Sequence, residues 1–145
     1  MANTFKVVTF AAEPNSAGTP YVVYTAAGST TTIVLGLILT NIHTAQVTAE
    51  VELVSTTGSR GGANNVTNGT SFLAKDVPIP VGSSLELLAG NKVVLETGDV
   101  LRVDCSVADT LSGTLSIMEI TYYAVYWKPI CTEIYVSKSC ISFFW

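Results

Sequence analysis

Charged residues are scarce in this 145-residue chain: Asp, Glu, Lys and Arg together make up 12% of it, about half the share in an average soluble domain. No Lys or Arg occurs between Lys6 and Arg60, and the net charge is −4. Proteins that bind nucleic acid or anionic membranes need Lys and Arg to neutralise phosphates, so both partners are disfavoured. The 48% of hydrophobic residues excludes a disordered chain.

Histidine and cysteine are too few and too scattered for the common catalytic and metal sites. The one histidine, His43, has no recognisable nucleophile and orienting group beside it, and we expect a residue at a strand end. Cys105, Cys131 and Cys140 lack the close pairs of a zinc site or a disulfide framework, with a Cys131–Cys140 bridge as the alternative. We expect no catalytic residue, metal or cofactor, and a protein that is not an enzyme.

Targeting and membrane segments are also lacking. The first residues do not combine a basic region with an apolar one, as a signal peptide does. The longest apolar run, 33–39, is about half of the ~20 residues that a membrane-spanning helix needs. These features predict a protein made in a reducing cytosol.

Strand-forming residues are what the sequence has in abundance. Val, Ile, Thr and Tyr recur between clusters of turn residues, and no segment shows convincing helical periodicity. Nine strands are predicted, enough for two packed sheets: 4–11, 20–26, 30–41, 47–55, 71–79, 84–88, 91–96, 100–107 and 114–127. The expected fold class is an all-β antiparallel β-sandwich of jelly-roll or immunoglobulin-like type, with an extended C-terminal tail.

The strand at 30–41 is apolar on both faces. Strict alternation puts the odd residues from Ile33 to Leu39 on one face, and Val34 and Ile38 on the other. Apolar residues on both faces indicate a strand that is covered on both sides. We expect the domain's own core to cover the odd residues and a partner subunit to cover the even ones.

Alternation also assigns faces in two other strands. In 47–55 it places Glu50 and Glu52 on a solvated face, with cation binding by the two carboxylates as the alternative. In 100–107 it turns Val107 inward and Asp104 outward. Pro78 lacks a backbone N–H and so predicts that strand 71–79 lies at a sheet edge.

Residues 1–127 form the predicted sandwich domain, and residues 128–145 form an apolar tail that packs on its own sandwich or on a neighbour. A long loop is expected over 56–70. The tyrosines and tryptophan of two strands suit core or subunit contacts, with a sugar-binding platform as the alternative: Tyr21, Tyr24, Tyr122, Tyr123, Tyr126 and Trp127.

Four stretches within 31–121 resemble small virion structural proteins of tailed bacteriophages, especially those of marine cyanobacteria. They are IVLGLILTN (33–41), FLAKDVPIPVGSSLE (72–86), KVVLETGDVLRV (92–103) and GTLSIMEIT (113–121). The resemblance covers about two thirds of the chain, and the segment after 121 departs from the pattern. It implies a β-sandwich on the capsid, the neck or the tail.

These features together predict a non-enzymatic phage virion structural protein. The first hypothesis is a capsid-associated decoration or cement subunit that forms a homo-oligomer and contacts other virion proteins, assembled in the host cytoplasm. The alternatives are a neck, collar or tail component, and a carbohydrate- or receptor-binding module. The expected subunit interface comprises Val34, Ile38, Tyr122, Tyr126, Trp127, Phe143, Phe144 and Trp145.

Overall fold

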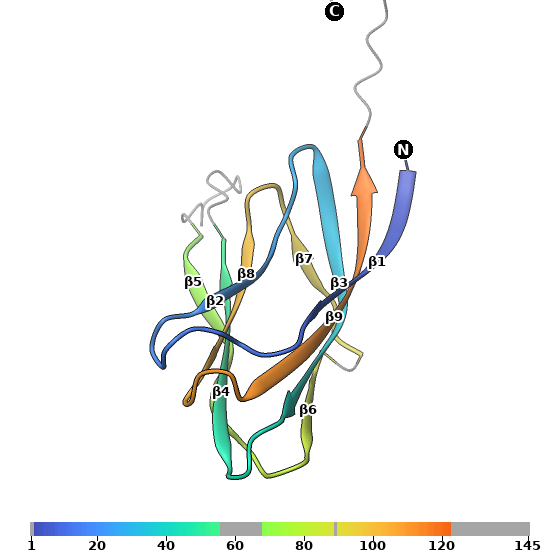
Figure 1. Ribbon diagram of the computed structural model, residues 1–145. Coiled ribbons are helices and arrows are strands. Elements are labelled where there is room, and N and C mark those ends of the chain that lie inside the picture. The colour runs from blue at the N-terminus through green and yellow to red at the C-terminus, as the bar shows by residue number, and fades with distance from the viewer. Residues whose placement is uncertain (1, 56–67, 89, 123–145) are drawn as a thin grey trace, which may run out of the picture.

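The computed structural model describes residues 2–55, 68–88 and 90–122, and these form nine strands in two antiparallel sheets (Figure 1). The five-stranded sheet has the order β1–β9–β3–β6, and β7 pairs with β3 beside β6; the four-stranded sheet has the order β2–β8–β4–β5. The predicted all-β antiparallel fold class is confirmed. Among the described residues there is no helix that could cross a membrane.

The strands lie close to the positions that the residue types predict. In the five-stranded sheet they are β1 (Ala2–Phe10), β3 (Thr30–Asn41), β6 (Ser84–Leu87), β7 (Val93–Leu95) and β9 (Leu111–Thr121). In the four-stranded sheet they are β2 (Tyr21–Thr25), β4 (Val47–Val54), β5 (Thr70–Ile79) and β8 (Val100–Cys105). The two sheets face each other, and β3 and β9 form the centre of the larger one (Figure 1).

The core lies between the sheets and consists of side chains that alternate along each strand. β3 and β9 supply Leu37, Leu39, Leu115 and Ile117, all of them without exposed surface. The four-stranded sheet supplies Val51 and the other inward residues of its two central strands: Val47, Ala49, Leu101 and Val103. Burial of one face of each sheet fixes the register, because a slip by one residue would expose the whole apolar set.

A β-bulge in β3 changes the faces that strict alternation predicts. Val34 pairs with Ile117 and Gly36 with Ser116, so Leu35 is an extra residue between the two pairs. Val34 therefore shares the inner face with Leu37 and is fully buried. The prediction that Val34 faces outward is wrong, and so are the inward predictions for Ile33 and Leu35.

Two strand ends also differ from the prediction. β8 ends at Cys105, and Val107, predicted to point inward, is 40% exposed in the following turn. β9 begins at Leu111, three residues before the predicted start at 114, so Gly113 lies inside the strand. A Cβ atom at Gly113 would lie 2.3 Å from Cζ of Phe10, so glycine makes room for the aromatic ring on the neighbouring strand.

β5 lies at an edge of the four-stranded sheet, as Pro78 predicts. Its pairing with β4 is irregular near Asp76, which has a positive φ of 50°. Most of the predicted loop 56–70, the end of the predicted strand 114–127 and the whole predicted tail 128–145 lie outside the described residues.

Candidate functional site

The outward side of the five-stranded sheet is the main apolar surface of the described structure. The pairing register puts Phe5 beside Met118, Met118 beside Ile33, and Ile33 beside Val94, so these side chains share one face. We call this surface the outer apolar face and define it by its members: Phe5, Val7, Ile33, Leu35, Ile38, Val94, Met118 and Ile120.

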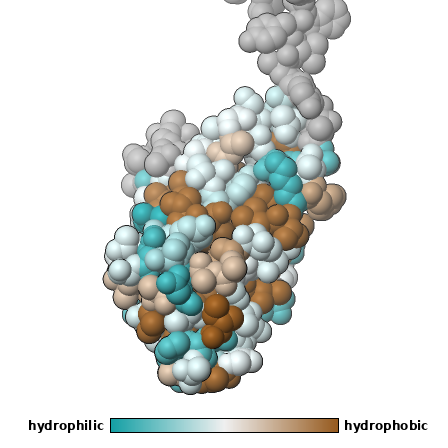
Figure 2. All heavy atoms as spheres, in the orientation of Figure 1, coloured by the Kyte–Doolittle hydropathy of each residue, from teal (hydrophilic) through white to brown (hydrophobic). Residues whose placement is uncertain are grey.

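Four members of the outer apolar face are well exposed: Phe5 (71%), Val7 (64%), Val94 (55%) and Ile38 (42%). Hydrophobic residues gather in patches on the side shown in Figure 2, including the region where β1 and β9 lie in Figure 1. Single exposed apolar residues are ordinary, but a contiguous group on one sheet face is typical of an interaction surface.

A hollow of about 290 Å³ lies within the outer apolar face between β1 and β3. Phe5, Val7 and Leu35 stand around it, while Ser116 forms part of its floor beside its pairing partner Gly36. Ser116, with its small side chain, thus lies opposite Gly36, which has none, and Leu35 of the bulge lines the hollow. This shape suits an apolar side chain from another strand.

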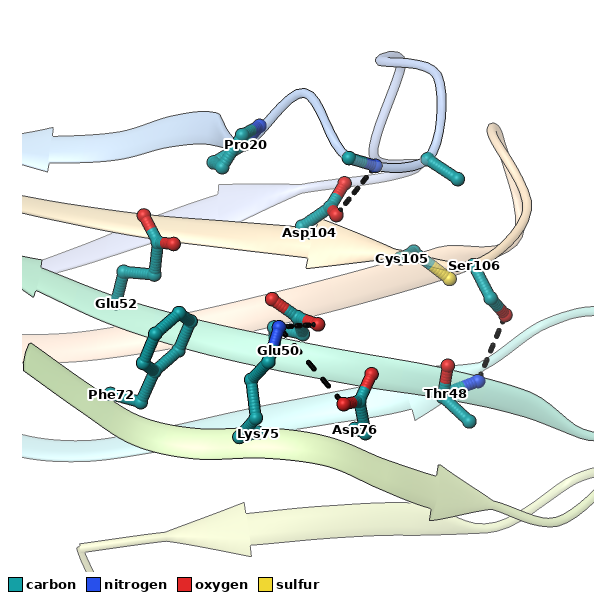
Figure 3. Close-up of a pocket in the computed structure, with 12 residues that line it drawn as sticks. Pro20, Thr48, Glu50, Glu52, Phe72, Lys75, Asp76, Asp104, Cys105 and Ser106 are labelled. Atoms are coloured by element: carbon teal, nitrogen blue, oxygen red, sulfur yellow. Dashed lines mark hydrogen bonds and ion pairs between the residues drawn. The ribbon is translucent and has the colours of Figure 1, made fainter.

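The outward side of the four-stranded sheet differs, because ion pairs cover it (Figure 3). Lys75 on β5 pairs with Glu50 on β4, and Arg102 Nη2 on β8 lies 2.6 Å from Glu52 Oε2. The predicted solvated face is therefore wrong for Glu52, which is only 8% exposed. Both carboxylates already have a cationic partner, and the described residues contain no cluster of three or more acidic, His or Cys groups that could hold a metal.

A groove of about 420 Å³ runs over this surface beneath the loop that joins β1 to β2. Phe72, Lys75 and Asp104 are among the residues that line it (Figure 3). A hydrogen bond anchors this loop to β8, because the backbone N–H of Gly18 donates to Oδ2 of Asp104 at 2.8 Å. Asp104 points outward as predicted but is only 7% exposed, since this loop covers it.

The tyrosines of β2 point into the sandwich and not into a sugar-binding platform. Tyr24 donates to Oε1 of Glu119 at 2.9 Å, and Lys6 Nζ lies 2.6 Å from Oε2 of the same carboxylate. The hydrogen bond from Lys6, with smaller help from Tyr24, lowers the pKa of Glu119 against the opposing effect of burial. Tyr21 packs edge-on against Phe10, with ring centroids 5.7 Å apart.

His43 and Cys105 have structural surroundings. His43 lies in the turn after β3, as predicted; its backbone N–H donates to Asn41 Oδ1 at 2.7 Å and its Nδ1 accepts from the N–H of Ala45 at 3.3 Å. Cys105 is buried as a free thiol, 3.4 Å from the Thr110 hydroxyl. Cys131 and Cys140 lie outside the described residues.

The structure places three of the eight predicted interface residues and does not bring them together. Ile38 belongs to the outer apolar face, Tyr122 is 51% exposed just after β9, and Val34 is in the core. The other five lie outside the described residues: Tyr126, Trp127, Phe143, Phe144 and Trp145.

Comparison with models of known protein families finds no match, and neither does comparison with curated proteins. Among solved structures, the chain is similar to a protein of the T13 particle of infectious bursal disease virus. The two share 12% sequence identity, the match covers 81% of this chain and 30% of the viral chain, and the TM-score is 0.46.

Two other solved structures give similar values. The VP2 subviral particle of the same virus shares 14% identity, covering 80% of this chain and 32% of the other, with a TM-score of 0.43. A Bacillus endospore appendage, from a family of disulfide-linked pili, shares 14% identity with 84% and 88% coverage and a TM-score of 0.40. The chain spans about a third of the viral chains. Values this low carry no functional information.

Phe5 and Val7 are members of the outer apolar face that the sequence did not single out. Their alternation with Lys6 and Val8 is visible in the sequence, but both sets contain an apolar residue. Only the register of β1 with β9, which pairs Lys6 with the buried Ile117, shows that the Phe5 set faces outward.

Proposed function

We propose that this chain is a non-enzymatic structural subunit of a tailed-bacteriophage virion, a capsid-associated β-sandwich that oligomerises and stabilises the particle. The observation that carries the proposal is the outer apolar face, whose exposed side chains come from β1, β3 and β7. The low charge of the chain and its resemblance to small virion proteins support the same role.

The outer apolar face supplies the contact in this proposal. Complete burial of a Val or Ile side chain contributes about 1.5–3 kcal/mol. Val94 and Ile38 are about half exposed, so covering each in an interface contributes roughly 1 kcal/mol. These two residues lie far from the polar, ion-paired face of the other sheet, which remains available to solvent or to other virion proteins.

Replacing Val94 and Ile38 together by serine tests the contact. We expect the double variant to dissociate about 30-fold more readily than wild type, since roughly 2 kcal/mol of apolar burial is lost. Val22→Ser is the matched control, because Val22 is 49% exposed on the outer side of the other sheet. Sedimentation velocity and binding to emptied phage particles give the readout.

Two results would contradict the proposal. A wild-type chain that stays monomeric at all concentrations and ignores particles has no assembling role. An equal effect of Val22→Ser would show that the outer apolar face is not the contact.

The number of copies per particle separates a capsid position, with hundreds of copies, from the alternative of a neck, collar or tail component, with about a dozen.

A further inference from the structure

β1 is the longest regular edge strand among the described residues. It pairs with β9 over nine residues without a bulge, and it is the last strand of its sheet (Figure 1). The other edges are weaker templates: β2 has five residues, β6 and β7 have four and three, and β5 contains Pro78 and a positive φ at Asp76. A long edge with free backbone groups is a template for strand addition.

The side chains of β1 define what an added strand must carry. Phe5 and Val7 point to the outer apolar face, whereas Lys6 and Val8 point to the inner side. Residues that are directly opposite in an antiparallel pair share a face. A matching strand therefore has apolar residues at alternate positions, and an acidic residue opposite Lys6 would share the ammonium that already pairs with Glu119.

We propose that residues 130–136 of a second copy of this chain add to the free edge of β1 as an antiparallel strand, with Glu133 opposite Lys6. The inference rests on the proposed function, because it takes the chain to be an assembling subunit. In the sequence Ile-Cys-Thr-Glu-Ile-Tyr-Val (130–136), three of the four alternate positions are apolar, the fourth is Thr132, and Glu133 lies between them. In this register Ile134 lies opposite Phe5, Thr132 opposite Val7, and Cys131 opposite Val8.

The direction of the chain assigns the added strand to another copy. Thr121 at the end of β9 pairs with Ala2 at the start of β1. A segment that doubles back from Tyr122 along the free edge of its own β1 would run parallel to it. Every strand pair in the described structure is antiparallel, and antiparallel addition to β1 requires a donor whose chain arrives from the far end.

The chain between β9 and the added strand is long enough for such an exchange. Seven residues lie between Tyr122 and Ile130, and the eight extended steps from one to the other span about 26 Å. Adjacent strands are only about 4.8 Å apart. The arm therefore reaches a neighbouring sandwich without any change in its own β9.

Disulfide trapping between two kinds of chain tests the register, with Cys140→Ser in both. The first kind of chain carries Val8→Cys and Cys131→Ser, so it offers a cysteine on β1 only. The second kind keeps Val8 and its native Cys131, so it offers a cysteine on the arm only. We expect mild oxidation to link the two kinds through a disulfide between the cysteine introduced at position 8 and Cys131. Val7→Cys with Thr132→Cys is the second pair to test. Residues that are directly opposite in an antiparallel ladder alternate between a shorter and a longer Cα–Cα distance, so one of these two neighbouring pairs has the shorter distance. Val7→Cys against Cys131 is the matched control, since these residues would lie on opposite faces.

A chain that ends at Trp127 completes the test and should associate at least tenfold more weakly than wild type. An oligomer of wild-type chains that forms neither disulfide, or that survives the truncation unchanged, overturns the inference and leaves the proposed function standing. A disulfide that forms only within one chain also overturns it. A wild-type chain that never assembles removes both proposals.

Discussion

Glu13 belongs to the loop that joins β1 to β2, and its carboxylate is enclosed. It has no exposed surface; the N–H of Asn15 donates to its Oε1 at 2.9 Å, and its Oε2 has no hydrogen-bond partner among the described residues. Burial, the largest cause, raises the pKa of this carboxyl; the Asn15 N–H opposes the rise, and the charges of Asp104 and Asp109 add to it. Ionised Glu13 therefore opposes folding.

The sign of this pKa shift predicts how Glu13→Gln changes stability. The folded-state pKa of Glu13 lies above the ordinary value of 4.5. Protonated Glu13 therefore contributes its full stabilisation of the fold below pH 4.5, and this stabilisation is lost as pH rises through the folded-state pKa. We expect Glu13→Gln to have a higher urea midpoint than wild type at pH 7 and a smaller difference at pH 4. Glu86→Gln, at an exposed position, is the control and should show no such difference. A Gln variant that is less stable at pH 7 contradicts this account.

At the scale of the strand, the face that a residue of β3 occupies decides whether it tolerates a charge. Leu37 is fully buried and its neighbour Ile38 is 42% exposed. An unpaired buried charge costs several kcal/mol, comparable to the whole stability of a domain, which is about 5–15 kcal/mol. Leu37→Asp should therefore abolish folding, while Ile38→Asp should fold as an isolated chain.

Circular dichroism and urea unfolding of the two variants check the strand faces. Soluble, cooperatively unfolding Leu37→Asp protein would show that this part of β3 does not face the core. Loss of folding in Ile38→Asp would show that the outer apolar face is packed within the monomer. Either result would require a different register between β3 and β9.

The strands follow from residue types, but their irregularities and positions do not. β3 has the predicted bounds because β-branched and apolar residues run from Thr30 to Thr40, with Gly36 as the one exception. The bulge at Leu35 depends on how β3 meets β9 and β7, which are distant in sequence. In the same way, the partner of Glu52 is Arg102, which lies fifty residues further along the chain. The pattern of residues within β4 alone therefore could not predict that the Glu52 carboxylate is buried by an ion pair.

At the scale of the whole molecule, the two sheets present unlike surfaces. The five-stranded sheet exposes Phe5, Val7 and Val94, whereas the four-stranded sheet carries the ion pairs of Lys75 and Arg102. A molecule with one apolar and one polar side has a preferred direction of contact. The proposed association through the apolar side therefore depends on burial of surface and little on attraction between charges.

This asymmetry predicts the effect of salt on self-association. Each chain carries a net charge of −4, so two copies repel weakly, and salt screens that repulsion. The single Lys6–Glu133 contact of the proposed added strand is an exposed pair, a class that contributes about 0–1 kcal/mol. We expect the dissociation constant, measured by sedimentation equilibrium, to stay constant or fall severalfold between ~0.05 and ~0.5 M NaCl, and sulfate to strengthen association further because it favours apolar burial. Weakening by tenfold or more over the same range would mean that opposite charges hold the copies together, and the outer apolar face would then not be the contact.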